Sequence, residues 1–356
     1  MTLQEKVDEN KLNEFIGKAV TEWGAAMGAL LLFVGDRLGL FKAMVDAGYI
    51  NPEEVARKTN TNPRMIKELL SALAAGGYVV YNTNEATYKL PPEIALALTD
   101  DSSPAYIAGG YQILTSLFKD EEKIIQAFRT GKGLGWGDHH HYLFEGTERF
   151  FKPGYVENLT KNWIPALDGV EAKLLKGGAK VADVGCGHGA STFLMAKAYP
   201  KSQILGFDYH KPSIEWARKQ AEKVDLKNVT FKVAGSTDFP GDDYDLVAFF
   251  DCFHDMGNPL GAAKHVLDSL KKKNGTFMLV EPFANDKMED NMNPIGRVFY
   301  SASTMICVPA SLNEDGPALG AQAGETKLGE VIKQAGFTKF RRATHTPFNL
   351  VLEAKP

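Results

Sequence analysis

The most constraining stretch of this sequence is KVADVGCGHGASTFLMA, residues 180–196. An apolar run ends in Asp183, three glycines follow at alternate positions, and a helical pattern begins at Ala190. Glycine permits backbone angles that other residues resist and lets a ligand lie directly against the main chain. A strand, a glycine turn and a helix in this order predict a nucleotide-type binding loop in an α/β domain.

The spacing of the glycines and the preceding acid indicate which ligand this loop binds. Gly185, Gly187 and Gly189 are spaced GxGxG, whereas a dinucleotide-binding loop is spaced GxGxxG. The carboxylate of Asp183 would repel a pyrophosphate, but it suits a ligand with an ammonium and a sulfonium group. Asp208 follows about 20 residues after the loop, where a carboxylate can accept both ribose hydroxyls. We therefore expect S-adenosylmethionine as the cofactor.

Seven apolar runs in the second half of the chain are candidate strands, and helical patterns follow the first five. This alternation predicts a mostly parallel, doubly wound sheet. Only ATHTPF separates the last two runs, so these are expected to pair as an antiparallel hairpin. The runs are Val181–Val184, Gln203–Asp208, Val229–Ala234, Tyr244–Phe250, Thr276–Glu281, Thr338–Arg342 and Asn349–Glu353.

The N-terminal hundred residues have a different pattern. Apolar residues recur at helical spacing over 12–34, and two shorter helices are expected to begin after the cap residues Asn51 and Asn62. The sequence YVVYNTNEATYKL then predicts two strands around a turn, which completes a winged helix. We expect a winged-helix and dimerisation domain at 1–100, a helical linker and active-site cover at 101–170, and a catalytic domain at 171–356.

A winged helix either recognises DNA or serves as a scaffold for dimerisation. Residues 1–100 contain 10 Lys and Arg against 13 Asp and Glu, which gives a net charge of −3. DNA readers draw much of their affinity from phosphate neutralisation, so this domain is not expected to bind nucleic acid. The long apolar helix at 12–34 favours packing against a second copy, and a homodimer is expected.

Residues 92–175 are expected to join the two halves through helices at Pro104–Phe118 and Glu121–Phe128. His139, His140 and His141 are consecutive, so their side chains diverge and form a poor chelate; no metal is expected. Aromatic residues are dense here and form either a pocket lid or the packing of an interdomain joint. They are Trp136, Tyr142, Phe144, Phe150, Phe151, Tyr155 and Trp163.

In open α/β sheets, ligands lie beyond the carboxyl ends of the strands. His254 follows the fourth strand, with Asp255 beside it and Glu281 at the end of the next strand. Histidine has a suitable pKa to take a proton from a hydroxyl, and a carboxylate can orient its ring, so these three are the candidate catalytic residues. The alternative is that His254 caps the next helix or only touches the adenosine of the cofactor. Further cofactor contacts are expected at Cys186, Tyr209, Gly235, Ser236, Asp251 and Cys252.

The motifs DVGCGHGAST, GFDYH, FFDCFHDMGNP, LVEPFAND and AGETKLGEVIKQAGF resemble those of SAM-dependent methyltransferases with an N-terminal winged-helix dimerisation domain. The resemblance covers nearly the whole chain and is nearest to bacterial enzymes of the mycobacterial type, often labelled transcriptional regulators. It implies a Rossmann-like class I fold with a seven-stranded sheet.

A more distant similarity to plant-type small-molecule O-methyltransferases implies that His254 is the base, flanked by Glu281 and Glu325. It also implies that NPIGRVFYSASTMICVPASL lines a pocket for an apolar small-molecule acceptor. The tryptophan that comes after the His-Asp pair in those enzymes is Met256 here, so the resemblance does not imply the same plane for the substrate.

Composition limits the expected binding partners and the expected cellular compartment. The net charge of −4 argues against a general polyanion binder, and three widely spaced cysteines cannot form a disulfide framework. The polar N-terminus predicts no secretory signal, and the apolar run at 25–35 is too short for a bilayer, so a cytoplasmic protein is expected. The rival functions are a SAM-responsive transcriptional regulator, a dehydrogenase and a SAM-binding protein without turnover.

Overall fold

A computed structural model describes residues 7–271 and 274–356. The chain divides into two compact units, residues 1–115 with 145–153, and residues 116–144 with 154–356. The helices α6 (Ala108–Lys119) and α8 (Tyr142–Asn158) each contribute residues to both units. The expected three-part division of the chain stays a prediction.

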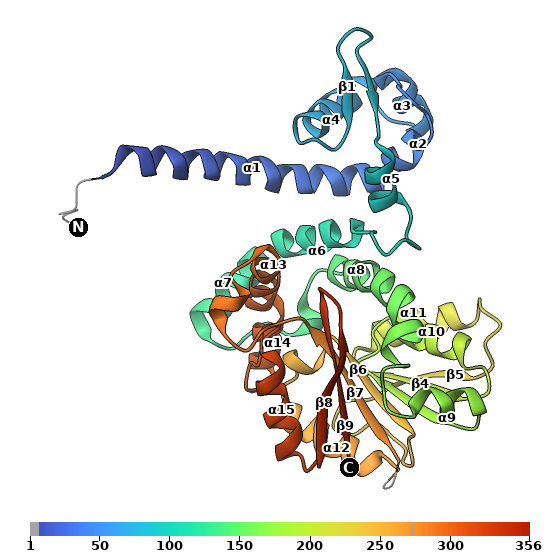
Figure 1. The fold of residues 1–356 in the computed structure, drawn as a ribbon. Helices are drawn as coiled ribbons and strands as arrows, with labels where there is room; N and C mark the ends of the chain where they lie inside the picture. Colours follow the sequence, from blue (N-terminus) through green and yellow to red (C-terminus); the bar gives the residue numbers. More distant parts are fainter. Residues whose placement is uncertain (1–6, 272–273) are drawn as a thin grey trace. The chain divides into compact units, whose positions relative to one another are not determined.

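The first unit contains the winged helix. The helices α1 (Glu9–Arg37), α2 (Leu40–Met44), α3 (Pro52–Thr59) and α4 (Pro63–Ala75) precede the strands β1 (Val80–Asn82) and β2 (Thr87–Lys89), and α5 (Pro92–Thr99) comes after them. Asn51 and Asn62 cap α3 and α4 with their side chains, as their positions before proline predicted. Strands β1 and β2 pair antiparallel and form the wing (Figure 1).

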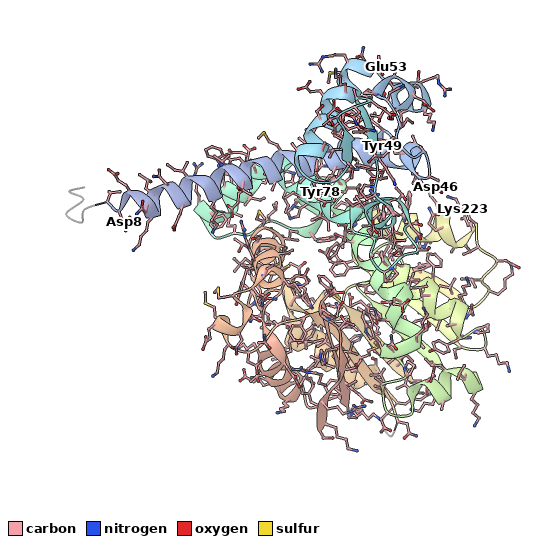
Figure 2. The ribbon with its side chains drawn as sticks, turned by 45° about the horizontal axis from the view of Figure 1, so that its top comes forward. Asp8, Asp46, Tyr49, Glu53, Tyr78 and Lys223 are labelled. Carbon is pink, nitrogen blue, oxygen red and sulfur yellow. The ribbon has the colours of Figure 1, made fainter. Side chains whose placement is uncertain are left out.

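Helix α1 carries large apolar side chains that remain exposed along most of its length; Figure 2 draws them from Asp8 onward. By length and composition alone, its 29 residues could cross a membrane, because apolar residues extend well beyond the run at 25–35. Core helices of other proteins meet the same criterion. The polar N-terminal stretch, on which the expectation of no secretory signal rests, lies partly outside the described residues.

The connecting region is helical. Helix α6 begins at Ala108 rather than at Pro104, because Asp100 accepts hydrogen bonds from Ser102 and the chain turns again between Ser103 and Tyr106. Helix α7 (Glu121–Thr130), the short 3-10 helix η1 (Trp136–Asp138), the π-helix η2 (Leu159–Trp163) and α9 (Val170–Lys176) complete the region. The helical expectation at Glu121–Phe128 is confirmed.

The second unit contains a seven-stranded sheet in the order β5-β4-β3-β6-β7-β9-β8. Strands β3 to β7 pair parallel, and β9 pairs antiparallel with both β7 and β8. The predicted sheet and C-terminal hairpin are confirmed. The strands are β3 (Lys180–Val184), β4 (Gln203–Asp208), β5 (Val229–Val233), β6 (Leu246–Phe250), β7 (Thr276–Pro282), β8 (Lys339–His345) and β9 (Asn349–Lys355).

Four of the five parallel strands lead into helices. Helix α10 (Ala190–Ala198) comes after β3, α11 (Lys211–Ala221) after β4, and α12 (Pro259–Ser269) after β6. The expected helix after β5 is wrong: the twelve residues between β5 and β6 contain Pro240 and Gly241 and form turns. Strand β7 leads through η4 (Met288–Asn291), α13 (Pro294–Ala302), the π-helix η5 (Ser303–Cys307), α14 (Val308–Asn313) and α15 (Gly324–Gln334).

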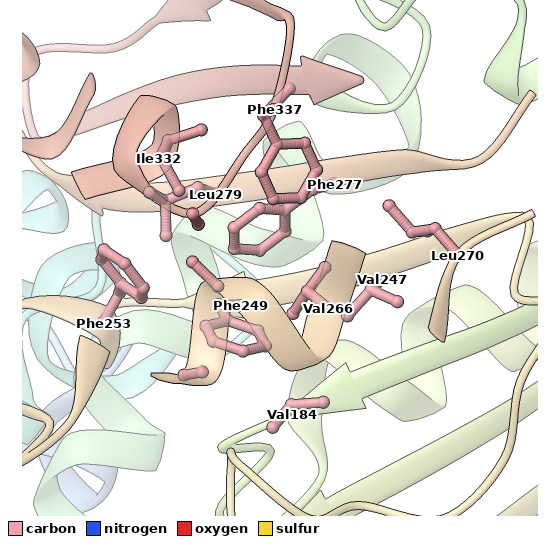
Figure 3. Packing of buried hydrophobic residues seen from close by; sticks show 14 of the residues in the cluster. Val184, Val247, Phe249, Phe253, Val266, Leu270, Phe277, Leu279, Ile332 and Phe337 are labelled. Atoms are coloured by element: carbon pink, nitrogen blue, oxygen red, sulfur yellow. The ribbon is translucent and has the colours of Figure 1, made fainter. Parts of the chain in front are cut away.

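The main core lies where β6, β7 and β9 meet the helices α12 and α15. Phe249 and Phe277 pack edge to face with ring centroids 5.0 Å apart, and Phe337 lies 5.7 Å from Phe277. Val266 of α12 and Ile332 of α15 close the cluster, as Figure 3 shows. This apolar layer supports the strands whose carboxyl ends carry the candidate site.

Candidate functional site

Asp183 is fully buried at the end of the central strand β3. Its Oδ2 accepts hydrogen bonds from the hydroxyls of Ser191 (2.7 Å) and Thr192 (2.6 Å), near the start of α10. Its Oδ1 is buried without a hydrogen-bond partner among the described residues. Burial raises the pKa of Asp183 to about 6, although the hydrogen bonds from Thr192 and Ser191 lower it. The site therefore holds one carboxylate oxygen that a cationic ligand group would satisfy.

The three glycines between β3 and α10 adopt left-handed backbone angles, with φ of +74° at Gly185, +52° at Gly187 and +86° at Gly189. A Cβ atom added at Gly185 would lie 2.6 Å from Sγ of Cys252. The thiol of Cys252 in turn lies 3.5 Å from the carbonyl oxygen of Val184. The glycine loop and the end of β6 are therefore packed too closely for a side chain between them.

Asp208 ends β4 and faces the glycine loop. Its Oδ2 accepts a hydrogen bond from the Gly187 amide and its Oδ1 accepts one from the His210 amide, both at 2.8 Å. Burial raises the pKa of this carboxyl, and the two amides oppose that rise. Ala234, just before the predicted contacts Gly235 and Ser236, donates its amide to the Asp208 carbonyl. The structure thus brings the ends of β4 and β5 together.

Two predicted cofactor contacts differ in their surroundings. The side chain of Cys186 packs into an apolar cluster with Ile214, Ala217 and Phe231, and burial raises its thiol pKa well above the ordinary value. Only its backbone, which donates to the Phe207 carbonyl, belongs to the loop surface. Tyr209, in contrast, is half exposed next to Asp208.

His254 lies in the 3-10 helix η3 (Phe253–Asp255) and is buried. Its Nδ1 is 2.6 Å from Oε2 of Glu281, and Oε1 of Glu281 accepts a hydrogen bond from the Phe253 amide at 3.0 Å. Burial alone would lower the pKa of His254, but the Glu281 carboxylate and then Cys307 raise it well above the ordinary value. Glu281 therefore orients the ring and stabilises its protonated form.

Asp251 and Asp255 lie on either side of His254 in sequence. Burial raises the pKa of Asp255 to about 7, while the neighbouring His254 lowers it. Burial and then Glu281 raise the pKa of Asp251 to about 8. Asp251 accepts hydrogen bonds from the hydroxyl of Tyr155 and the amide nitrogen of Asn349, both at 2.8 Å. These two partners were not predicted, because each lies far from Asp251 in the chain.

Of the two glutamates expected beside His254, only Glu281 contacts it. Glu325 instead pairs with Arg342 of β8 at 2.5 Å. The ring also interacts with Cys307, the last residue of the π-helix η5, for which the sequence predicted only a reduced thiol. The backbone carbonyl of His254 also accepts the Gly320 amide at 3.0 Å. Segments that come after β7 therefore surround the histidine.

The three consecutive histidines differ in their surroundings. His139 is buried with Nδ1 3.1 Å from Asp120, whereas His140 and His141 stack on each other. Over the described residues, no group of three or more His, Cys, Asp or Glu side chains could hold a metal ion. The ring of Phe144 packs 4.6 Å from His210, which places this part of the aromatic segment beside the residues just after Asp208.

Comparisons with known proteins agree with this geometry. Residues 175–336 match the family of methyltransferase domains, and residues 25–100 match the Rv2258c-like winged HTH domain. Residues 175–336 are therefore a methyltransferase domain, and the cofactor of such domains is S-adenosylmethionine. The chain combines this domain with a winged HTH domain.

Two curated relatives match short segments. An uncharacterized protein of Rickettsia prowazekii is 42% identical over 60 residues, which are 17% of this chain and 24% of that protein. A probable (S)-tetrahydroprotoberberine N-methyltransferase of Papaver bracteatum is 32% identical over 89 residues, 25% of each protein. The matched part thus spans about a quarter of the length of these relatives.

Solved structures with the same fold extend over the whole chain. A putative O-methyltransferase from Nostoc punctiforme has a TM-score of 0.68 at 17% identity and covers 99% of this chain and 100% of its own. Human N-acetylserotonin methyltransferase in complex with SAM has a TM-score of 0.67 at 17% identity, and the match covers 100% of this chain and 99% of that chain. At this identity the likeness establishes the fold.

The residues present fit S-adenosylmethionine. The buried, unpartnered Oδ1 of Asp183 suits an ammonium group, and the left-handed glycines leave the backbone open to close approach. Asp208, held by two backbone amides, retains lone pairs for the hydroxyls of a ribose.

Proposed function

We propose that this protein transfers a methyl group from S-adenosylmethionine to a hydroxyl oxygen of a small, partly apolar molecule. The observation that carries the proposal is the buried His254–Glu281 pair. His254 lies two residues after Cys252, whose thiol packs against the glycine loop. When bound, S-adenosylmethionine supplies a methyl group activated by its sulfonium. The chain supplies the binding groups and a site for the acceptor's proton.

His254 has the features of a general base. Glu281 holds Nδ1, and Nε2 takes a proton from the acceptor hydroxyl as the oxygen attacks, once the acceptor displaces the Cys307 thiol from the ring. Glu281 then stabilises the imidazolium that forms, while Asp255 remains a neighbouring acid. Because Glu281 and Cys307 raise the pKa of His254, the ring keeps its proton to a higher pH than an ordinary histidine does, and methyl transfer should rise as the pH increases.

The His254→Ala variant tests the proposal, with His254→Gln as a control for packing. We expect turnover to fall by about 100-fold, the lower range for loss of a general base, while S-adenosylmethionine affinity by calorimetry changes less than about twofold. Glu281→Gln should also shift the pH profile of turnover toward lower pH, because it removes the charge that raises the pKa of His254. Turnover equal to that of the unchanged protein in both His254 variants would refute the base role.

We also propose that the protein is a cytoplasmic homodimer. Eight large apolar residues of α1, among them Trp23 and Met27, are exposed, and a second copy of the same helix would cover such a surface. Cys186, Cys252 and Cys307 are free thiols, in keeping with a reducing compartment.

The alternative of a SAM-responsive regulator has the winged HTH match in its favour. Against it, Arg64 of α4 forms an ion pair with Glu68 at 2.5 Å. The other cationic residue of that helix is Lys67, so little positive charge remains there to bind a DNA phosphate. The acidic net charge of the domain weakens it further. The same acidity supports a scaffold role for the winged helix within an enzyme.

A further inference from the structure

Acidic residues lie at the carboxyl ends of three adjacent strands of the parallel sheet. Asp208 ends β4, Asp183 lies next to the last residue of β3, and Asp251 comes directly after β6. Because β4, β3 and β6 are neighbours in the sheet, the three carboxyl groups lie along one edge, beside the glycine loop. The ribose and the ammonium of the cofactor account for Asp208 and Asp183, whereas the base chemistry at His254 does not use Asp251.

The surroundings of Asp251 fix its carboxyl group in place. Its Oδ2 accepts a hydrogen bond from the hydroxyl of Tyr155, and its Oδ1 accepts one from the amide nitrogen of Asn349, both at 2.8 Å. The ring of Tyr155 in turn packs 5.5 Å from Phe250 and 5.9 Å from Trp163. The backbone of Asp251 has a φ of +52°, a left-handed angle that strains a residue with a Cβ. Strain of this kind persists only where the surroundings impose it, and it is concentrated at functional positions.

Asp251 lies between the glycine loop and the proposed base. The thiol of the next residue, Cys252, occupies the space beside Gly185, and His254 comes two residues later. A cofactor held by the acids at the ends of β3 and β4 has its sulfur between its amino-acid part and its ribose, beside the glycine loop. Its methyl group must also face an acceptor next to His254. Both requirements direct the sulfonium toward the end of β6, where the carboxyl of Asp251 is partly exposed.

The methyl donor and its product differ by one positive charge. S-adenosylmethionine carries an ammonium and a sulfonium, whereas S-adenosylhomocysteine keeps only the ammonium, which suits Asp183 in both cases. We propose that the Asp251 carboxylate faces the sulfonium and is the group by which the site distinguishes the methyl donor from the spent product. Tyr155 and Asn349 act through Asp251 as positioning residues. The proposal rests on the proposed function, because it takes the acceptor to lie beside His254.

The protonation state of Asp251 gives this proposal a measurable consequence. Burial and then Glu281 raise the pKa of Asp251 to about 8, so the carboxyl of the free protein is mostly protonated at pH 7. The hydrogen bonds from Tyr155 and Asn349 and the charge of His254 oppose that rise. A sulfonium next to the carboxyl would favour its ionised form, and the proton would pass to the buffer. The ammonium is common to both ligands, so a proton released at its site is the same for both.

Calorimetry on the unchanged protein measures this proton. S-adenosylmethionine and S-adenosylhomocysteine are each titrated at pH 7 in phosphate and in imidazole, two buffers whose enthalpies of ionisation differ. The difference in heat between the buffers gives the number of protons released. We expect S-adenosylmethionine to release on the order of one proton more than S-adenosylhomocysteine. Equal release for the two ligands would overturn the proposal, and the measurement requires no variant.

A matched pair of variants assigns the proton to one residue. Asp251→Asn and Asp255→Asn each replace a carboxyl group with a raised pKa just beyond β6. Asp251→Asn should abolish the difference in proton release and weaken S-adenosylmethionine by about tenfold, while S-adenosylhomocysteine binding changes less than about twofold, which also shows that the variant folds. Asp255→Asn should keep both the proton difference and the relative affinities. The opposite assignment, or unchanged relative affinities in Asp251→Asn, would overturn the proposal.

Tyr155→Phe tests the positioning of the carboxyl group. It keeps the aromatic ring but removes one hydrogen-bond donor to Asp251. We expect S-adenosylmethionine to bind about threefold more weakly and S-adenosylhomocysteine to bind as before, because only the former requires the ionised carboxylate. An equal loss for both ligands would show that Tyr155 acts on the fold of the site rather than through Asp251. A failure of the base role would instead appear in the turnover of His254→Ala and leave these binding differences intact.

Discussion

Asp251 is a partly buried acid that keeps its proton to an unusually high pH. Burial and the nearby Glu281 raise its pKa to about 8, whereas an unfolded chain would ionise it near 3.8. Between these two values the folded state binds the proton that the unfolded state has lost. The free energy of unfolding therefore falls as the pH rises from about 4 to about 8.

The Asp251→Asn variant should remove this pH dependence. Asparagine can still bond to Tyr155 and Asn349 but does not ionise, so the variant should be more stable than the unchanged protein at pH 8 by on the order of 5 kcal/mol. Below about pH 4 the two proteins should be alike. Thermal unfolding followed across this pH range measures the difference. Parallel curves for the two proteins would mean that Asp251 ionises freely in the fold.

The site residues at the ends of strands were predictable from the sequence. Asp183, Asp208 and His254 each lie at or just beyond the end of an apolar run, and parallel strands bring such positions to one edge. The hydrogen-bond partners of Asp251 were not predictable, because Tyr155 and Asn349 lie 96 and 98 residues from it in the chain. Sequence periodicity contains no information about such distant pairs.

At the scale of elements, the strands and the C-terminal hairpin were predictable from alternation and loop length. The absence of a helix between β5 and β6 was not predictable, because short apolar patterns near proline and glycine resemble a helical turn. Glu325 was misassigned for a related reason. Its ion-pair partner is Arg342 of β8, which depends on how α15 packs beside that strand. The spacing of residues within α15 does not predict such tertiary packing.

The glycine loop should be sensitive to a single methyl group. Gly185→Ala would place a Cβ 2.6 Å from Sγ of Cys252 and would also force alanine to a φ of +74°. We expect S-adenosylmethionine affinity to fall by at least about tenfold. Calorimetry on Gly185→Ala, Cys252→Ala and the double variant measures the effect.

The double variant separates the two causes of that loss. Removing the thiol relieves the close contact but not the left-handed backbone strain, which costs alanine about 1 kcal/mol. Affinity should thus recover only in part. A double variant no better than Gly185→Ala would show that backbone strain alone disables the loop.

For the whole molecule, the exposed face of α1 predicts assembly. Trp23 is 66% exposed, and covering it against a second copy would contribute about 2 kcal/mol. We expect a dimer in analytical ultracentrifugation at micromolar concentration, and a monomer for Trp23→Asp. Asn13→Asp, on the same helix at an exposed polar position, is the control and should stay dimeric. A monomeric mass for the unchanged protein would contradict the proposed homodimer.

The order of strands in the sheet also bears on how the chain acquires its structure during synthesis. Strand β9 is made after the other six, yet it lies between β7 and β8 and pairs with both. Until it emerges from the ribosome, β7 presents an open edge, and Asp251 lacks the amide of Asn349. The nascent domain thus exposes an unpaired strand edge until β9 has been made. Chaperones that shield such edges should bind it until β9 is inserted.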